Sequence, residues 1–238
     1  MKNMPEVKLG LIAVSRDCFP ITLSDRRSQE VVTAAKEQGV EVYRSKTVVE
    51  SETDMLKAVA DIEAEGVNAL VVYLGNFGPE SAETIIAQKF AGPVMYVAAA
   101  EESQEDLVQG RGGAYWGMLN CSYNLALRGC KAIIPEYPVG RPEDVAKMIA
   151  EFIPVARAIL GLKNLKVFTF GPRPQDFMAC NAPIQPLFDL GLEIQENSEL
   201  DLLVAFRKHA DDPRISDVVK EMAEETGNDN PYAGILPK

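Results

Sequence analysis

The first candidate binding segment, SRDCFPITL at 15–23, places Arg16 and Asp17 directly after an apolar run. A guanidinium fork can bind hydroxyl or carboxylate oxygens, so Arg16 predicts recognition of a small polar ligand. A surface arginine paired with a neighbouring aspartate is the alternative. The segment has no glycine, so it lacks the G-x-G-x-x-G turn of a dinucleotide fold.

A second segment, LGNFGPE at 74–80, sets Asn76 and Phe77 between two glycines. Pro79 and Glu80 then suit the start of a helix. Backbone N–H groups beside an aromatic ring favour a polar ligand with an apolar face. The alternative is an ordinary strand-to-helix turn in which Phe77 fills the core.

Two further segments are rich in turn residues. GRGGAYWG at 110–117 sets three glycines before the only tryptophan, Trp116, but lacks the Lys-Ser/Thr of a phosphate loop. FGPRPQDFMACN at 170–181 directs Gln175 and Asp176 toward the end of a strand. Asp176 as a simple helix cap is the other interpretation.

Metal and acid–base signals are weak. The single histidine, His209, is expected to be a solvated residue at the end of a helix. Adjacent acids such as Glu101–Glu102 are expected on solvated faces. The four cysteines form no C-x-x-C motif, which favours reduced thiols and a cytoplasmic location.

Composition excludes some partners. With 35 acidic and 24 basic residues, the formal charge is −11, which disfavours a surface for nucleic acid. No stretch reaches 18 consecutive apolar residues, so we expect no membrane association.

Short β-branched runs alternate with helical patterns, which predicts a parallel, doubly wound α/β sheet with flavodoxin-like strand order 2-1-3-4-5. Strands are expected at 7–14, 39–44, 67–74, 93–99 and 131–136. Helices are expected at 25–38, capped by Ser24, and at 52–65, 80–89, 114–129 and 142–160, the last with a kink or break at Pro154.

We predict a first domain over 1–161 and the start of a second α/β domain over 162–238. The second part reads as strands at 165–171 and 192–196 with helices near 175–190, 198–209 and 214–226. Two parallel strands cannot easily bury a core, so this domain is expected to be incomplete or to depend on a partner.

Three stretches, LGNFGPE, GRGGAYWGMLNCSYNLALRG and FGPRPQDFMACNAPIQPLFDLGLEIQENSELDLL, resemble the amino-terminal and middle domains of the L-fucose/L-arabinose isomerase family. The resemblance is to its fucose-isomerase-like branch. It implies interconversion of aldoses and ketoses with a divalent metal, usually Mn²⁺. The family's metal ligands lie in later parts that have no counterpart here, so we expect no Mn²⁺ bound by this chain and no catalytic residue within it.

The resemblance also implies a homo-oligomer in which the amino-terminal domain lines a neighbouring subunit's sugar pocket. Arg16, Asn76 and Phe77 would then contact the sugar, with Gln175 and Asp176 from the second domain. Trp116 would stack on a sugar face. Which sugar is bound stays open.

Two other functions remain. The chain could be a non-catalytic sugar- or metabolite-binding module that closes on its ligand. A reading frame that continues past Lys238 would favour the isomerase portion instead. An FMN-binding protein is disfavoured because the first loop lacks a phosphate cradle.

Overall fold

The computed structural model describes residues 4–103, 112–163, 165–171, 176–180 and 183–226. The chain divides into two compact units, one spanning Pro5–Leu160 and the other formed mainly by residues from Gly161 onward.

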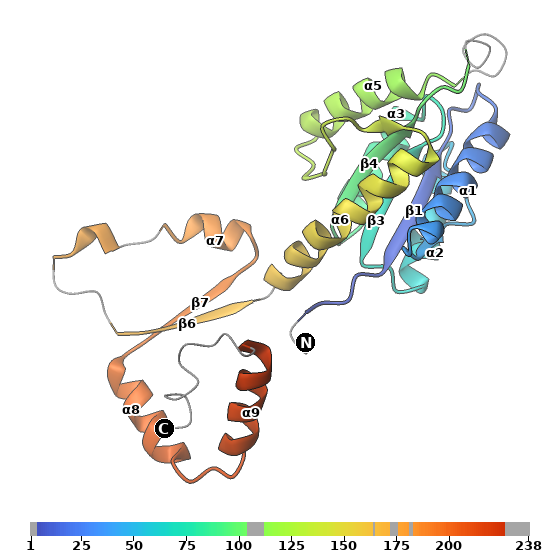
Figure 1. Cartoon of the computed structure of the whole chain (residues 1–238). Coiled ribbons are helices and arrows are strands. Elements are labelled where there is room, and N and C mark those ends of the chain that lie inside the picture. Colours follow the sequence, from blue (N-terminus) through green and yellow to red (C-terminus); the bar gives the residue numbers. More distant parts are fainter. Residues whose placement is uncertain (1–3, 104–111, 164, 172–175, 181–182, 227–238) are drawn as a thin grey trace. The chain divides into compact units, whose positions relative to one another are not determined.

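The first unit is built on a parallel sheet with the order β2-β1-β3-β4-β5, which confirms the predicted α/β fold and strand order (Figure 1). Leu9 of β1 pairs with β2 at Val42 and with β3 at Ala69, and Leu70 of β3 pairs with β4 at Val94. The strands are β1 Leu9–Val14, β2 Val42–Arg44, β3 Ala69–Leu74, β4 Val94–Ala99 and β5 Val139–Gly140.

Every residue of β1, β3 and β4 is buried, which requires protein on both faces of the sheet. Helices provide this cover. Helices α2, α3 and α5 contact one another in series, and Gln38, just after α1, donates a hydrogen bond to the Glu143 carbonyl in α6. The helices are α1 Ile21–Glu37, α2 Glu52–Ala64, α3 Glu80–Lys89, α5 Ala114–Leu127 and α6 Pro142–Leu162.

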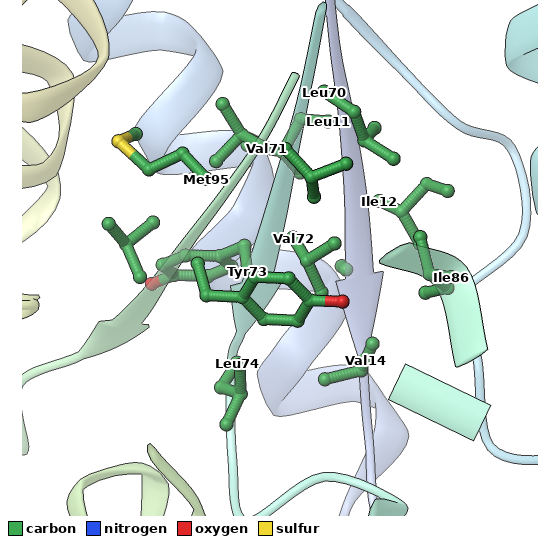
Figure 2. Packing of buried hydrophobic residues seen from close by; sticks show 14 of the residues in the cluster. Leu11, Ile12, Val14, Leu70, Val71, Val72, Tyr73, Leu74, Ile86 and Met95 are labelled. Carbon is green, nitrogen blue, oxygen red and sulfur yellow. The ribbon is translucent and has the colours of Figure 1, made fainter. Parts of the chain in front are cut away.

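The core lies along the three central strands. Figure 2 shows Leu11 and Ile12 of β1 beside Val71 and Val72 of β3, with Ile86 of α3 packed near them. Burial of these apolar side chains supplies the main driving force for folding of this unit and leaves the strand ends to carry polar groups.

The predicted strand at 131–136 is wrong in its position. Ile133 forms only an isolated bridge to Met95, and the ladder with β4 is made by Val139–Gly140. Pro135 and Pro138 have no N–H donors, so the apolar run before them cannot continue a ladder.

The predicted cap at Ser24 is also wrong. Helix α1 begins at Ile21, after Pro20, and Ser24 lies within it. Its hydroxyl donates a 2.6 Å hydrogen bond to the Val14 carbonyl at the end of β1. Ser24 therefore donates to the last carbonyl of β1 and does not cap the helix.

Helix α6 contains Pro154 and is not broken there. The residues buried along its face include Ile149 and Phe152 before the proline and Ala156 after it. Packing on both sides holds the helix together despite the hydrogen bond that proline removes.

The second unit contains a two-stranded parallel sheet, in which Lys166 pairs with Glu193. Of the residues described in this unit, only Leu192 belongs to the buried hydrophobic set. Its elements are β6 Lys166–Phe170, η1 Met178–Cys180, α7 Gln185–Asp189, β7 Glu193–Asn197, α8 Glu199–His209 and α9 Ile215–Thr226.

A continuous helix near 175–190 is not formed. The described residues there form the short η1 and α7 instead. Pro183 precedes α7 and Pro186 lies in its first turn, where a proline is tolerated but could not continue an earlier helix.

Candidate functional site

The carboxyl ends of β1, β3 and β4 lie at one edge of the parallel sheet, the position where ligands bind in open α/β folds. We call this region the carboxyl edge. It consists of residues 15–20, 75–79, 100–103 and 112–117.

Asn76 joins two loops of the carboxyl edge. Its side chain is fully buried, and its Oδ1 accepts hydrogen bonds from the backbone N–H groups of Arg16 (2.9 Å) and Gly78 (3.3 Å). Its Nδ2 donates to Ser15 Oγ (2.8 Å) and to the Pro20 carbonyl (3.4 Å). The amide thus fixes the geometry of the loops after β1 and β3.

Asn76→Ala is expected to lower the free energy of unfolding by about 2 kcal/mol, because it leaves buried backbone N–H groups without acceptors. Chemical denaturation measures this change. Asn68→Ala is the matched control, since Asn68 also bridges two segments, accepting from Lys8 N and donating to the Glu6 carbonyl, but at exposed positions. Equal losses in the two variants would contradict the role given to Asn76.

Arg27, in α1, also binds residues of the carboxyl edge. Arg27 is only 2% exposed. Its guanidinium group donates hydrogen bonds to the Gly75 carbonyl (2.8 Å) and to Glu101 Oε2 (2.9 Å). Glu101 Oε1 in turn accepts from Ala114 N, the first residue of α5 (3.2 Å). One buried cation therefore links α1 to the loops after β3 and β4 and to the start of α5.

This linkage corrects the expectation of a solvated face for Glu101 but not for Glu102, whose side chain is 53% exposed. The Glu101 side chain is 18% exposed and pairs with Arg27, while Glu102 lies 3.6 Å from Arg27 Nε. A buried guanidinium requires carboxylate partners. The signal in the sequence was Arg27 itself, which lies on the same helix face as the buried Ser24, Val31 and Ala34.

Phe77 and Phe19 form an aromatic surface at the edge. Their rings stack with centroids 6.0 Å apart and an interplanar angle of 28°. Gly113 lies against both rings, and a Cβ added at Gly117 would overlap the Phe77 carbonyl oxygen. The start of α5 thus packs directly on the Phe77 turn.

Two candidate residues are more exposed. The Arg16 side chain is 40% exposed, with its Nε 3.6 Å from Asp17 Oδ1. Trp116 is 60% exposed and meets the Tyr115 ring edge-on at 5.5 Å. The structure therefore joins Arg16 to Asn76 through a backbone hydrogen bond, has Phe77 next in the same turn, and places Trp116 in the first turn of α5.

The two candidates in the second unit are not brought into this group. Gln175 lies outside the described residues, and Asp176 is exposed in the segment between β6 and η1. Their predicted contact with sugar stays a prediction.

Acidic groups accompany the arginines of the edge. Arg16 lies near Asp17, Arg26 pairs with Glu30 and Glu102, and Arg44 pairs with Asp25. Burial raises the pKa of Glu50, whose carboxyl group also interacts with Ser15 and is repelled by Asp17.

Among the residues that the structure describes, no three His, Cys, Asp or Glu side chains are arranged to hold a metal ion. The sequence resemblance places the Mn²⁺ ligands in other parts of the family's enzymes, and that placement stays a prediction. His209, at the end of α8, has its Nδ1 3.6 Å from Asp212 Oδ2.

Residues 10–163 match the family model described as fucose/sulfoquinovose isomerase, N-terminal domain. The chain belongs to this family. The match covers more than half of the sequence and nearly all of the first unit, which confirms the fucose-isomerase-like amino-terminal domain. No curated protein sequence gives a significant match.

As a fucose/sulfoquinovose isomerase N-terminal domain, the first unit carries the carboxyl edge described above within the matched residues. The match ends at residue 163, so the resemblance of 170–203 to a middle domain stays a prediction, as does the arabinose-isomerase relationship. In the described part of the chain, no helix has the length and apolar character needed to span a membrane.

Proposed function

We propose that this chain supplies the substrate-recognition portion of a sugar ketol-isomerase that interconverts an aldose and a ketose. The family match over residues 10–163 carries the proposal. The arrangement of the carboxyl edge supports it, because Asn76 and Arg27 fix its loops while Arg16 and Trp116 remain exposed.

In this proposal Phe77 provides an apolar surface for the C–H face of a sugar, and Arg16 donates hydrogen bonds to its hydroxyl groups. Asn76 acts through the loops, since both its oxygen and its nitrogen are engaged within the protein. Trp116 stacks on the sugar from the first turn of α5, and Gln175 and Asp176 contribute from the second unit.

The substrate is proposed to be a neutral sugar of the L-fucose type and not a sulfonated one. Arg16, Arg26, Arg27 and Arg44 each lie within 3.6 Å of a carboxylate. A sulfonate group would compete with these carboxylates, whereas hydroxyl groups can accept from the same guanidinium groups.

No step of proton transfer is assigned to this chain. Moving a proton between neighbouring sugar carbons needs a positioned base, and a catalytic metal needs several converging ligands. We therefore propose that the Mn²⁺ used by the complete enzyme is held by other residues. We also propose a cytoplasmic homo-oligomer in which the carboxyl edge of one subunit faces the sugar pocket of its neighbour.

Calorimetric titration of the purified chain tests the recognition role. L-Fucose is expected to bind with a dissociation constant of about 1 mM or weaker, because the chain supplies only part of a pocket. Phe77→Ala should weaken binding about tenfold, which corresponds to one lost apolar contact. Tyr123→Ala, which removes an exposed aromatic ring farther along α5, should leave binding unchanged.

Sulfoquinovose binding stronger than L-fucose binding would contradict the proposed substrate class. Turnover of L-fucose by this chain with Mn²⁺ alone would contradict the proposal that the metal ligands and the catalytic base lie outside it. Equal loss in the Phe77 and Tyr123 variants would argue for binding outside the carboxyl edge, as expected of a different metabolite-binding module.

A further inference from the structure

Glu83 lies in the first turn of α3, directly beside the Asn76–Gly78 turn. Its side chain is fully buried, with 0% exposure. A Cβ added at Gly78 would overlap Glu83 Oε2, so the carboxyl group fills the space that the glycine leaves open. Gly78 has φ of +77°, a conformation that favours glycine, and its N–H donates to Asn76 Oδ1.

Neither carboxyl oxygen of Glu83 has a hydrogen-bond partner with ordinary geometry among the described residues. The Cys121 thiol of α5 interacts with this carboxyl group, but sulfur is a weak donor and a weak acceptor. A native protein seldom leaves such a group without a role.

The charged and titratable groups around Glu83 do not compensate a negative charge. Glu80, in the same helical turn, repels it, and Arg16 attracts it only through space. The Tyr96 hydroxyl of β4 donates to the Glu83 backbone carbonyl (2.7 Å) and not to its carboxyl group. Burial raises the pKa of Glu83 to about 8, and the pKa of the adjacent Cys121 thiol is raised as well.

We infer that Glu83 is a positioning residue that supports the Asn76–Gly78 turn as a neutral acid, and that loss of its proton loosens this turn. A carboxylate at this position must gain water. Its Oε2 packs against Gly78, so hydration displaces the backbone that carries Phe77. The carboxyl edge is thereby coupled to pH without any ligand, and the inference does not depend on the proposed sugar.

Hydrogen–deuterium exchange of the peptide segment 74–84 tests this coupling. Between pH 6 and pH 9 the protection factor, corrected for intrinsic exchange, should fall about a hundredfold in the unaltered chain, because opening releases one proton and so becomes about tenfold easier per pH unit until the pKa of about 8 is reached. Glu83→Gln keeps the shape without the titration and should show no fall. Glu80→Gln, which removes an acid from the same turn, should behave like the unaltered chain.

A fall of equal size in Glu83→Gln, or no fall in the unaltered chain, would overturn the inference. If Glu83→Gln does not fold, infrared spectroscopy of the unaltered chain decides the question. The carbonyl stretch of a protonated carboxyl group should be present at pH 7 and lost by pH 9. Its absence at pH 7 would equally overturn the inference.

Discussion

Arg27→Met is expected to lower the free energy of unfolding by about 3 kcal/mol or more, because one partner of a buried ion pair is removed. Methionine keeps most of the side-chain volume, so the loss comes from the guanidinium group. The Glu101 carboxylate, 18% exposed, would lose its 2.9 Å partner, and the Gly75 carbonyl would lose its 2.8 Å donor. Urea denaturation measures the change.

Arg26→Met is the matched control for this prediction. Arg26 is the adjacent residue and also pairs with glutamates, but its side chain is 48% exposed. An exposed ion pair contributes less than about 1 kcal/mol. Similar costs for the two variants would show that Arg27 does not hold the edge together.

Glu83→Gln is expected to change how stability depends on pH. The pKa of Glu83 is raised from 4.5 to about 8 in the folded chain, so the folded state retains a proton that the unfolded state releases. The resulting stability is complete below pH 4.5 and is lost as pH rises to about 8. Glutamine does not titrate and avoids this loss.

The variant should therefore gain stability relative to the unaltered chain between pH 5 and pH 8, on the order of 4 kcal/mol, and the difference should then level off. Parallel denaturation series at several pH values measure it. A difference that stays constant with pH would show that Glu83 is ionised in the folded state. Glu80 is only half-buried, so the stability difference between Glu80→Gln and the unaltered chain should not change comparably with pH.

Much of the first unit could be predicted because its signals are local. The apolar runs that became β1, β3 and β4 are buried at every residue, as expected for parallel strands covered on both faces. The error at 131–136 arose because an apolar run was given more weight than Pro135 within it. The error at Ser24 arose because a serine before a helical pattern can bond elsewhere, here to Val14.

Less of the candidate site could be predicted from the sequence. The glycines flanking Asn76 and Phe77 indicated a turn. They did not indicate that the Asn76 amide would bind Arg16, Ser15 and Gly78. Arg27 and Glu83 were missed because each is a charged residue within an amphipathic helix. Whether such a residue faces the core is decided by packing between elements distant in sequence.

Amide chemical-shift mapping with L-fucose tests the central claim, that the carboxyl edge of the first unit receives a sugar. Saturable shifts are expected at Arg16, Gly78 and Ala114, with no response at Gly66 and Asn68 near the opposite ends of the strands. Shifts confined to that opposite end, or none with fucose in large excess, would contradict it.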